Sequence, residues 1–367
     1  MIAGSLVLTL LLQGTGGVPR DPHVAPPSWA PEVDALFAEW DRPGSPGCAL
    51  GVIQGGKLVH ARGFGEASVE LSAPITSATV FDIGSTSKQF TAACIGLLVQ
   101  DEKLRVEDEI HEWIPELAYW DFDVTLDHLL HHTSGIPDYI GLLAQRGKKT
   151  ADWTTPADAL AALAEVQKLE FEPGTRFEYS NSNFFLLSLV IERAAKTPFQ
   201  EFVKRRIFEP LHMDSTLLLS DHTLVVPRRA TGYVPRRSGG FAVEMSDWEQ
   251  LGDGAVQTSV EDLAKWDENF YSHAVGGEAL HAFLHGLVPL TNGTASGYAR
   301  GLMVDRFRGR PRVSHGGAWA GFRAQLMRFP EQHTSIVCLS NLGTMDPNAQ
   351  CEKVAAIVLA DRTEAEK

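Results

Sequence analysis

The chain has 367 residues, of which 44% are hydrophobic and 21% are charged, so we expect a folded globular protein with one large domain or two lobes. Its formal net charge of −14 repels phosphate backbones and anionic lipid surfaces, which argues against a nucleic-acid partner. Its four cysteines contain no C-x-x-C pair, which excludes a zinc or redox motif of that kind and leaves the disulfide state open.

The first predicted element is a signal peptide over residues 1–17. Residues 2–12 form an apolar run of suitable length that is too short to span a bilayer, although no Lys or Arg precedes it. Residues 18–27 are predicted to be a linker. We therefore expect an exported protein, periplasmic or secreted, with a mis-assigned start or a lipid-facing tether as alternatives. No later segment is long and apolar enough to predict a transmembrane helix.

The segment after the linker alternates between helix and strand signals. Residues 28–40 are predicted to form a helix, because apolar side chains recur there near helical spacing. Residues 47–54 and 57–64 are two strand-like runs joined by Gly55-Gly56, which predicts a β-hairpin. Residues 89–100 follow as an apolar helix.

The middle and the end of the chain differ in their patterns. Strand signals fade from residue 111 to residue 254, where 156–169 and 183–195 have helical composition. Strands return at 301–307, 312–315, 322–329 and 335–341, before a helix over 348–360. We predict an α/β (α+β) fold in which residues 28–110 and 255–367 build one antiparallel sheet flanked by helices. Residues 111–254 would form an inserted, all-helical lobe.

Ser85 and Lys88 form an S-x-x-K pattern at the predicted start of a helix. This spacing places both side chains on one face, where a desolvated lysine could help to remove the serine proton. The N-terminus of the helix would also favour a developing oxyanion. Taken alone, the pattern is equally typical of a serine cap followed by a surface lysine.

Two further motifs contain candidate site residues. Tyr179 could act as a base beside a lysine, and the amide of Asn181 could hold a substrate carbonyl. His315, Gly317 and Ala318 follow a strand-like run, where glycine permits close approach and the Ala318 N–H could pair with that of Ser85. Taken alone, each segment is more typical of an ordinary turn or hairpin.

Together these motifs, in this order, resemble those of the serine β-lactamase-related family, which includes class C β-lactamases, penicillin-binding-protein-like enzymes and peptidase family S12. Residues 129–137, Leu-Leu-His-His-Thr-Ser-Gly-Ile-Pro, resemble a signature of that family, and residues 253–263 resemble its later glycine-rich segment. The adjacent histidines of this signature are interpreted as structural. The resemblance extends from about Trp29 to about Ala360.

The resemblance implies a role for each motif residue. Ser85 would be the acylated nucleophile, Lys88 and Tyr179 would transfer protons, and Asn181 would position the substrate. The N–H groups of Ser85 and Ala318 would form the oxyanion hole, while His315 and Gly317 would line the substrate site. No metal and no organic cofactor is implied.

One departure from the family pattern affects the expected substrate. His315 stands where many relatives have a lysine, and a neutral imidazole binds a carboxylate less strongly than an ammonium group does. This chemistry predicts weak β-lactamase activity at best. In the family that the chain resembles, a histidine at this place is more typical of D-amino-acid peptidases and carboxypeptidases, so the resemblance implies a D-amino-acid peptidase, a carboxypeptidase or an esterase, acting on a small molecule, a peptide or an ester. The alternatives are a penicillin-binding or sensor-type protein that acylates without efficient turnover, and a non-catalytic structural role. The sequence does not determine the oligomeric state.

Overall fold

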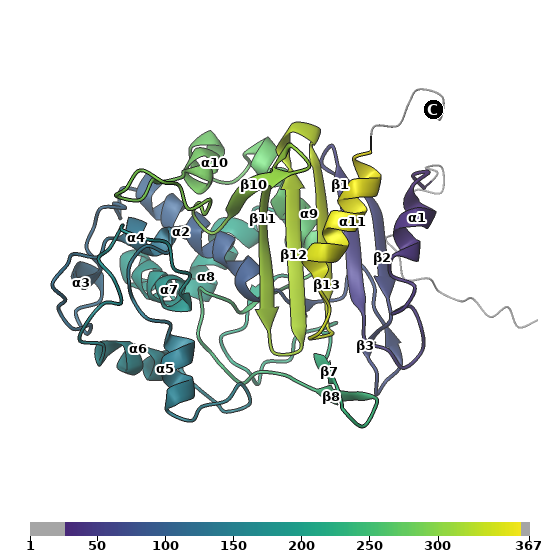
Figure 1. Cartoon of the computed structure of the whole chain (residues 1–367), viewed down its shortest axis with the longest axis horizontal. Helices are drawn as coiled ribbons and strands as arrows, with labels where there is room; N and C mark the ends of the chain where they lie inside the picture. The colour runs from purple at the N-terminus through teal and green to yellow at the C-terminus, as the bar shows by residue number, and fades with distance from the viewer. Residues whose placement is uncertain (1–25, 361–367) are drawn as a thin grey trace, which may run out of the picture.

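The computed structural model describes residues 26–360 (Figure 1). The predicted signal peptide, residues 1–17, and most of the predicted linker lie outside the described residues. Within residues 26–360, no helix is both long enough and apolar enough to cross a membrane.

A six-stranded antiparallel sheet forms the centre of the fold, with the strand order β10-β11-β12-β13-β1-β2. Its strands are β1 (Cys48–Gln54), β2 (Lys57–Phe64), β10 (Met303–Phe307), β11 (Arg310–Trp319), β12 (Phe322–Phe329) and β13 (Thr334–Ser340). Strand β1 pairs with β13 from Cys48 opposite Ser340 to Gln54 opposite Thr334. The prediction that both ends of the chain build one sheet is therefore confirmed, as is the β1–β2 hairpin.

Helices cover both faces of this sheet (Figure 1). Side chains of β1 alternate between two apolar cores: Ala49 and Ile53 pack in one, and Leu50 and Val52 in the other. The first core contains residues of α2 (Lys88–Gln100), α9 (Val260–Ser272) and α10 (Gly277–His285). The second contains residues of α1 (Ala30–Ala35) and α11 (Pro347–Val358). Burial on both faces explains why β1 is almost entirely apolar.

The remaining helices lie beside the sheet, on the far side of α2 (Figure 1). They are α3 (Ile110–Trp113), α4 (Leu126–Leu130), α5 (Tyr139–Gln145), α6 (Pro156–Ala164), α7 (Asn181–Ala195) and α8 (Phe199–Val203), which continues as one π-helical turn, Lys204–Phe208. The segment 111–254 is thus rich in helix, as expected. The prediction that it is all helical needs correction, because it also contains three short strands, β6 (Leu217–Leu218), β7 (Tyr233–Pro235) and β8 (Phe241–Val243). The boundaries chosen for this lobe stay a prediction.

The short strands of the fold form three small sheets. Strand β6 pairs with β9 (Val256–Thr258), which pairs in turn with β5 (Phe81–Asp82). Strands β7 and β8 pair with each other, as do β3 (Glu66–Ser68) and β4 (Ala73–Pro74). The β5-β9-β6 sheet connects the inserted segment to the residues just before Ser85.

Several predicted elements differ in length from the observed ones; the helical segment expected over 156–169, for example, is helical only over Pro156–Ala164. The helix expected over 28–40 is limited to α1, Ala30–Ala35, and turns follow it. The strand expected over 312–315 extends through Gly316 and Gly317 as β11, Arg310–Trp319. Two 3-10 turns, Gly84–Ser87 and Pro330–Gln332, complete the fold. All four cysteines lie within the described residues and are buried free thiols.

Candidate active site

Ser85 lies in the 3-10 turn Gly84–Ser87, between β5 and the start of α2. The turn depends on the glycine before the serine. Gly84 has φ +48°, and a Cβ on this residue would lie 2.7 Å from the backbone nitrogen of Ala318. Asp82 holds the turn from the other side, because its Oδ1 accepts a 2.8 Å hydrogen bond from the Gly84 N–H. The backbone at Ser85 therefore lies in close contact with β11.

Lys88, the first residue of α2, points its amine at Ser85. Its Nζ lies 3.0 Å from Ser85 Oγ, 2.8 Å from Asn181 Oδ1 and 2.7 Å from the backbone oxygen of Asp253. The side chain is completely buried, so these neighbours replace its hydration shell. The Asn181 and Asp253 oxygens thus fix the amine next to the serine hydroxyl.

Asn181 and Tyr179 approach the same place from the start of α7. The Asn181 Nδ2 and backbone N–H both donate 2.8 Å hydrogen bonds to Asp138 Oδ2, which leaves the amide oxygen facing Lys88. The Tyr179 ring centroid lies 5.0 Å from Lys88 Nζ, and 38% of this residue is exposed. The phenol therefore lies at the open side of the site, next to the buried amine.

The His132 ring packs against the Tyr179 ring. The two ring centroids lie 4.2 Å apart, and His132 is fully buried. Its Nδ1 accepts hydrogen bonds from the Ser180 N–H at 3.2 Å and from Asn183 Nδ2 at 3.1 Å. Burial, together with the charge of Lys88, holds the pKa of His132 well below its usual value, so the imidazole is neutral. These contacts agree with the interpretation of this histidine as structural.

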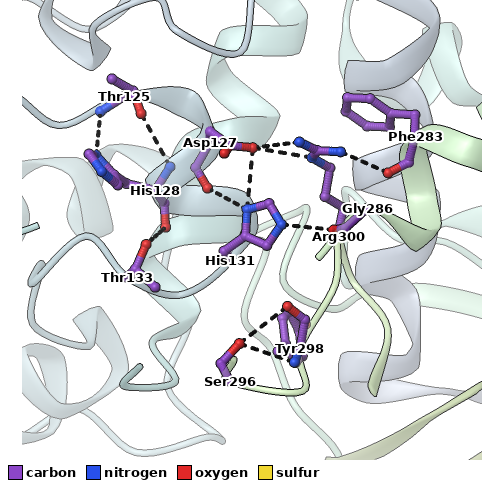
Figure 2. Close-up of polar contacts among 10 residues, drawn as sticks. All are labelled: Thr125, Asp127, His128, His131, Thr133, Phe283, Gly286, Ser296, Tyr298 and Arg300. Carbon is purple, nitrogen blue, oxygen red and sulfur yellow. Dashed lines mark hydrogen bonds and ion pairs between the residues drawn. The ribbon is translucent and has the colours of Figure 1, made fainter. Parts of the chain in front are cut away.

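His131 connects α4 to the loop that contains Tyr298 (Figure 2). Its Nδ1 lies 2.9 Å from the Asp127 backbone oxygen, and its Nε2 lies 3.0 Å from the Gly286 backbone oxygen. Arg300 adds a 2.8 Å ion pair to Asp127 Oδ1. His131 and Arg300 together lower the pKa of Asp127 to about 2, against the effect of burial. This network fixes the segment between Gly286 and Arg300.

His315 lies on β11 and is held by contacts within the protein at both ring nitrogens. Its Nε2 lies 3.0 Å from Tyr298 Oη, and its Nδ1 lies 2.6 Å from the Gly316 backbone oxygen. Burial and the nearby charge of Lys88 lower the pKa of His315 to about 4. A direct hydrogen bond from this imidazole to a substrate would require one of these contacts to break.

Gly317 and Ala318 place β11 against the serine turn. A Cβ on Gly317 would lie 1.8 Å from the Ile83 backbone oxygen and 3.1 Å from the Ser85 nitrogen, so only glycine fits there. The Thr86 hydroxyl adds a 3.2 Å hydrogen bond to the backbone oxygen of His315. The backbone nitrogens of Ser85 and Ala318 are thereby placed at one junction, as an oxyanion site requires.

Two cavities meet at Ser85, and we name them after one residue of each. The Arg229 cavity has a volume of about 150 Å³ and lies toward the inserted segment. Its lining includes Ser85, Asn181, Arg229, Trp248, Asp253 and Phe322. The Tyr179 cavity also reaches Ser85, and its lining includes Ser85, Tyr179, His315, Gly317, Arg323 and Gln325.

The structure thus brings together every residue that the sequence predicted for the site. The sequence reasoning missed Asp138, Tyr298 and Arg229. It noted Asp253 only as the start of a glycine-rich segment. Burial raises the pKa of the Asp253 carboxyl to about 7, and its Oδ1 has no hydrogen-bond partner among the described residues. No periodic pattern marks these residues, because long-range contacts alone place them.

One group of potential metal ligands lies elsewhere in the described part of the chain. The ligand atoms of Asp221, His222 and Glu249 lie within 4.8 Å of one another. His222 Nδ1 is already 2.8 Å from Glu249 Oε1, and Asp221 is exposed. None of the three lines either cavity at Ser85.

Known proteins share both this sequence pattern and this fold. The chain is 29% identical to penicillin-binding protein 4* of Bacillus subtilis over 309 residues, which cover 78% of this chain and 66% of the relative. It is 27% identical to a D-aminopeptidase of Gluconobacter oxydans, with 84% of this chain and 58% of the relative covered. The chain therefore spans about three fifths to two thirds of the length of these relatives.

Solved structures show the same architecture. An octameric penicillin-binding protein homologue from Pyrococcus abyssi superimposes with a TM-score of 0.79 and 25% identity, over 90% of this chain and 77% of that one. A D-amino acid amidase from Ochrobactrum anthropi gives a TM-score of 0.74 at 21% identity, over 90% of this chain and 98% of that one, which shows the fold alone. The profile of the Beta-lactamase family matches residues 33–360, and the chain belongs to that family.

Proposed function

We propose that this protein is a serine hydrolase that cleaves amide or ester bonds through an acyl-enzyme on Ser85. The contact between Lys88 Nζ and Ser85 Oγ, at 3.0 Å, supports this function most directly. A serine hydroxyl is a weak nucleophile unless a base lies within hydrogen-bond reach, and here the amine is held in place by two further acceptors.

The proposed reaction has two halves. In the first, Ser85 Oγ attacks the carbonyl carbon while its proton passes to Lys88, which must be a neutral amine to accept it, and Tyr179 relays the proton toward the leaving group. The oxyanion forms beside the backbone nitrogens of Ser85 and Ala318. The leaving group then takes a proton from this pair and departs, and the serine ester remains. In the second half, water attacks the ester while the same pair takes one proton from it, the acyl group leaves as a carboxylic acid, and the proton passes to Ser85 Oγ.

The position of Tyr179 assigns each half of the substrate to a cavity. A group that protonates the leaving amine must lie on the leaving-group side of the scissile bond. Tyr179 lines the Tyr179 cavity and is absent from the lining of the Arg229 cavity. The leaving group would therefore occupy the Tyr179 cavity, and the acyl group would occupy the Arg229 cavity.

The relatives favour D-amino-acid compounds as the substrate class. One similar protein, 27% identical to this chain, is named a D-aminopeptidase. We propose that this chain acts on amides or short peptides with a D-amino acid on the acyl side, and that esters are also accepted because they use the same acylation groups. Export of the protein stays a prediction from the apolar run at residues 2–12.

Hydrolysis of paired anilides tests this proposal. The p-nitroanilides of D-alanine and L-alanine would be compared for wild type, Ser85→Ala and Lys88→Met. We expect wild type to release p-nitroaniline faster from the D compound, and both variants to lose at least about 1,000-fold in kcat. Equal rates for Ser85→Ala and wild type would contradict the assignment of the nucleophile.

A second function has one observation in its favour. One similar protein is named a penicillin-binding protein, and a protein of this fold could bind a penicillin on Ser85 without efficient turnover. Intact mass measured over hours after addition of a penicillin would separate the two functions. An adduct that persists for hours, without release of nitroaniline from either anilide, would favour the penicillin-binding or sensor-type function.

A further inference from the structure

Arg229 places a guanidinium group in the cavity that also contains Ser85. Among the described residues, this group makes no hydrogen bond and no close ion pair, and its Nε is buried without a partner. A guanidinium has five N–H donors, and a partly buried one is normally bound to carboxylates or carbonyls. Burial accordingly lowers the pKa of Arg229. The side chain is therefore a partly desolvated cation with unused donors beside the nucleophile.

The backbone holds this side chain in place. Arg229 forms a parallel bridge with Val80, and the next residue, Ala230, donates a 2.9 Å hydrogen bond to the Val80 oxygen. The neighbouring Arg228 is exposed and donates a 2.5 Å hydrogen bond to Ser215 Oγ. The two adjacent arginines thus differ in environment, and only Arg229 lines the cavity.

The acidic groups of the cavity leave these donors available. Asp82 is the acid that acts on Arg229 through its charge, but its oxygens accept from the Gly84 N–H and from Gln257 Nε2, each at 2.8 Å. Asp253 accepts from the Tyr139 hydroxyl at 3.0 Å. Neither carboxylate forms an ion pair with the guanidinium, and Lys88 adds a second cation near Asp253.

The proposed function assigns the acyl group of the substrate to the Arg229 cavity. Its volume of about 150 Å³ is close to that of a cavity that accommodates benzene, so it has room for a short side chain. A guanidinium binds a carboxylate through two parallel hydrogen bonds and binds a neutral amide less strongly. We propose that Arg229 is a specificity-determining residue that selects substrates with a carboxylate on the acyl side, such as an acidic D-amino acid.

Isosteric acid and amide substrates test this inference, which rests on the proposed function. We would measure kcat/KM for the p-nitroanilides of D-glutamate and D-glutamine, and of D-aspartate and D-asparagine. Wild type should prefer the acidic member of at least one pair by about tenfold or more, and Arg229→Gln should reduce this ratio to about one. Arg229→Lys should retain part of the preference, because it keeps the charge and loses the paired donors.

Arg323 provides a matched control, since it lines the Tyr179 cavity and donates hydrogen bonds to the backbone oxygens of Ala320 and Phe322. Arg323→Gln should leave the ratio of acidic to neutral rates unchanged. A general loss of folded enzyme would lower both rates equally and would therefore leave this ratio unchanged. Equal losses toward both members of a pair in Arg229→Gln would mean that Arg229 only balances Asp82, and would overturn the inference.

The remaining outcomes separate this inference from the function on which it rests. If wild type cleaves the anilides with no preference for the acids, the inference fails and the proposed function stands. If wild type cleaves none of the four anilides and Ser85 does not react with a fluorophosphonate, both fail. If Ser85 reacts but no anilide is cleaved, the amidase activity and this inference are both contradicted.

Discussion

Tyr298 Oη lies 3.0 Å from His315 Nε2, and the contact at the other ring nitrogen determines which of these two atoms donates. The other ring nitrogen, Nδ1, lies 2.6 Å from the Gly316 backbone oxygen, which can only accept a hydrogen bond. Nδ1 must therefore hold the proton, and Nε2 accepts from the Tyr298 hydroxyl. With its pKa lowered to about 4, His315 is neutral at pH 7 and presents no cation to a substrate.

A neutral His315 predicts weak β-lactamase activity. Penicillins and cephalosporins contain a carboxylate, and this position lacks the ammonium group that binds it in relatives with a lysine. We expect kcat/KM for a chromogenic cephalosporin to be at least about 100-fold below that for the preferred D-amino-acid anilide. Absorbance assays at pH 7 would compare the two substrates. Turnover of the cephalosporin at a rate equal to that of the anilide would contradict this reading of His315.

Tyr298→Phe should destabilise the folded protein. The change removes the donor to His315 Nε2 and leaves a buried acceptor without a partner, which costs about 1–3 kcal/mol. Urea denaturation at pH 7 would give the free energy of unfolding of each variant. Tyr119→Phe is the control, because Tyr119 is 80% exposed and should change this free energy by less than about 0.5 kcal/mol. Equal effects of the two substitutions would disprove the hydrogen bond.

Much of the fold follows from local patterns in the sequence. The hairpin at Gly55-Gly56 was predictable, because both glycines adopt the positive φ that such a turn needs and the flanking runs have strand composition. The central sheet was predictable from strand signals at both ends of the chain. The short strands β6, β7 and β8 were not, since two or three residues are too few to show a period.

The same distinction between local patterns and long-range contacts applies to the candidate site. The nucleophile, the lysine and the glycine-rich strand belong to motifs that are contiguous in the sequence. The hydrogen bonding of His315 depends on Tyr298. The position of Arg229 depends on its bridge with Val80, and its side chain lines the same cavity as Ser85. Such contacts join residues that are distant in the sequence and leave no trace in local composition. Burial and hydrogen bonding at these positions could therefore be identified only from the structure.

Gly317→Ala should impair acylation much more than Gly316→Ala. A Cβ at Gly317 would lie 1.8 Å from the Ile83 backbone oxygen, so β11 must move away from the serine turn. At Gly316 the nearest atom is the side-chain oxygen of Gln325 at 2.8 Å, which can rotate away. Because a displacement of about 1 Å can cost about 100-fold in rate, we expect such a loss for Gly317→Ala and less than about tenfold for Gly316→Ala.

The rate of Ser85 labelling by a fluorophosphonate would measure this difference, and circular dichroism would confirm that both variants fold. Similar rates for the two glycine variants would show that the close approach of β11 to the serine turn does not position the acylation groups.

Because of Asp253, the free energy of unfolding of the wild-type protein should decrease as the pH rises from 4 to 7. Its pKa is raised from 3.8 to about 7 in the folded protein, mainly by burial. The protonated carboxyl therefore favours the folded state fully below pH 4, and this contribution is lost as the pH rises to about 7. Asp253→Asn removes the titration, so its free energy of unfolding relative to wild type should increase from pH 4 to pH 7.

Urea denaturation at intervals of one pH unit would test this prediction. Asp221→Asn is the control, because Asp221 is exposed and hydrogen bonds to Thr223 lower the pKa of its carboxyl. Its difference from wild type should stay constant between pH 4 and pH 7. A constant difference for Asp253→Asn as well would show that the Asp253 carboxyl does not titrate in this range.

The central claim is that Lys88 activates Ser85 as a nucleophile, and intact-mass analysis after a fluorophosphonate probe tests it most directly. We expect wild type to gain the mass of one phosphonyl group, Ser85→Ala to gain none, and Lys88→Met to react at least about 100-fold more slowly. A Lys88→Met variant that is labelled as quickly as wild type, a wild-type protein that stays unlabelled, or a Ser85→Ala variant that is labelled as quickly would contradict the account.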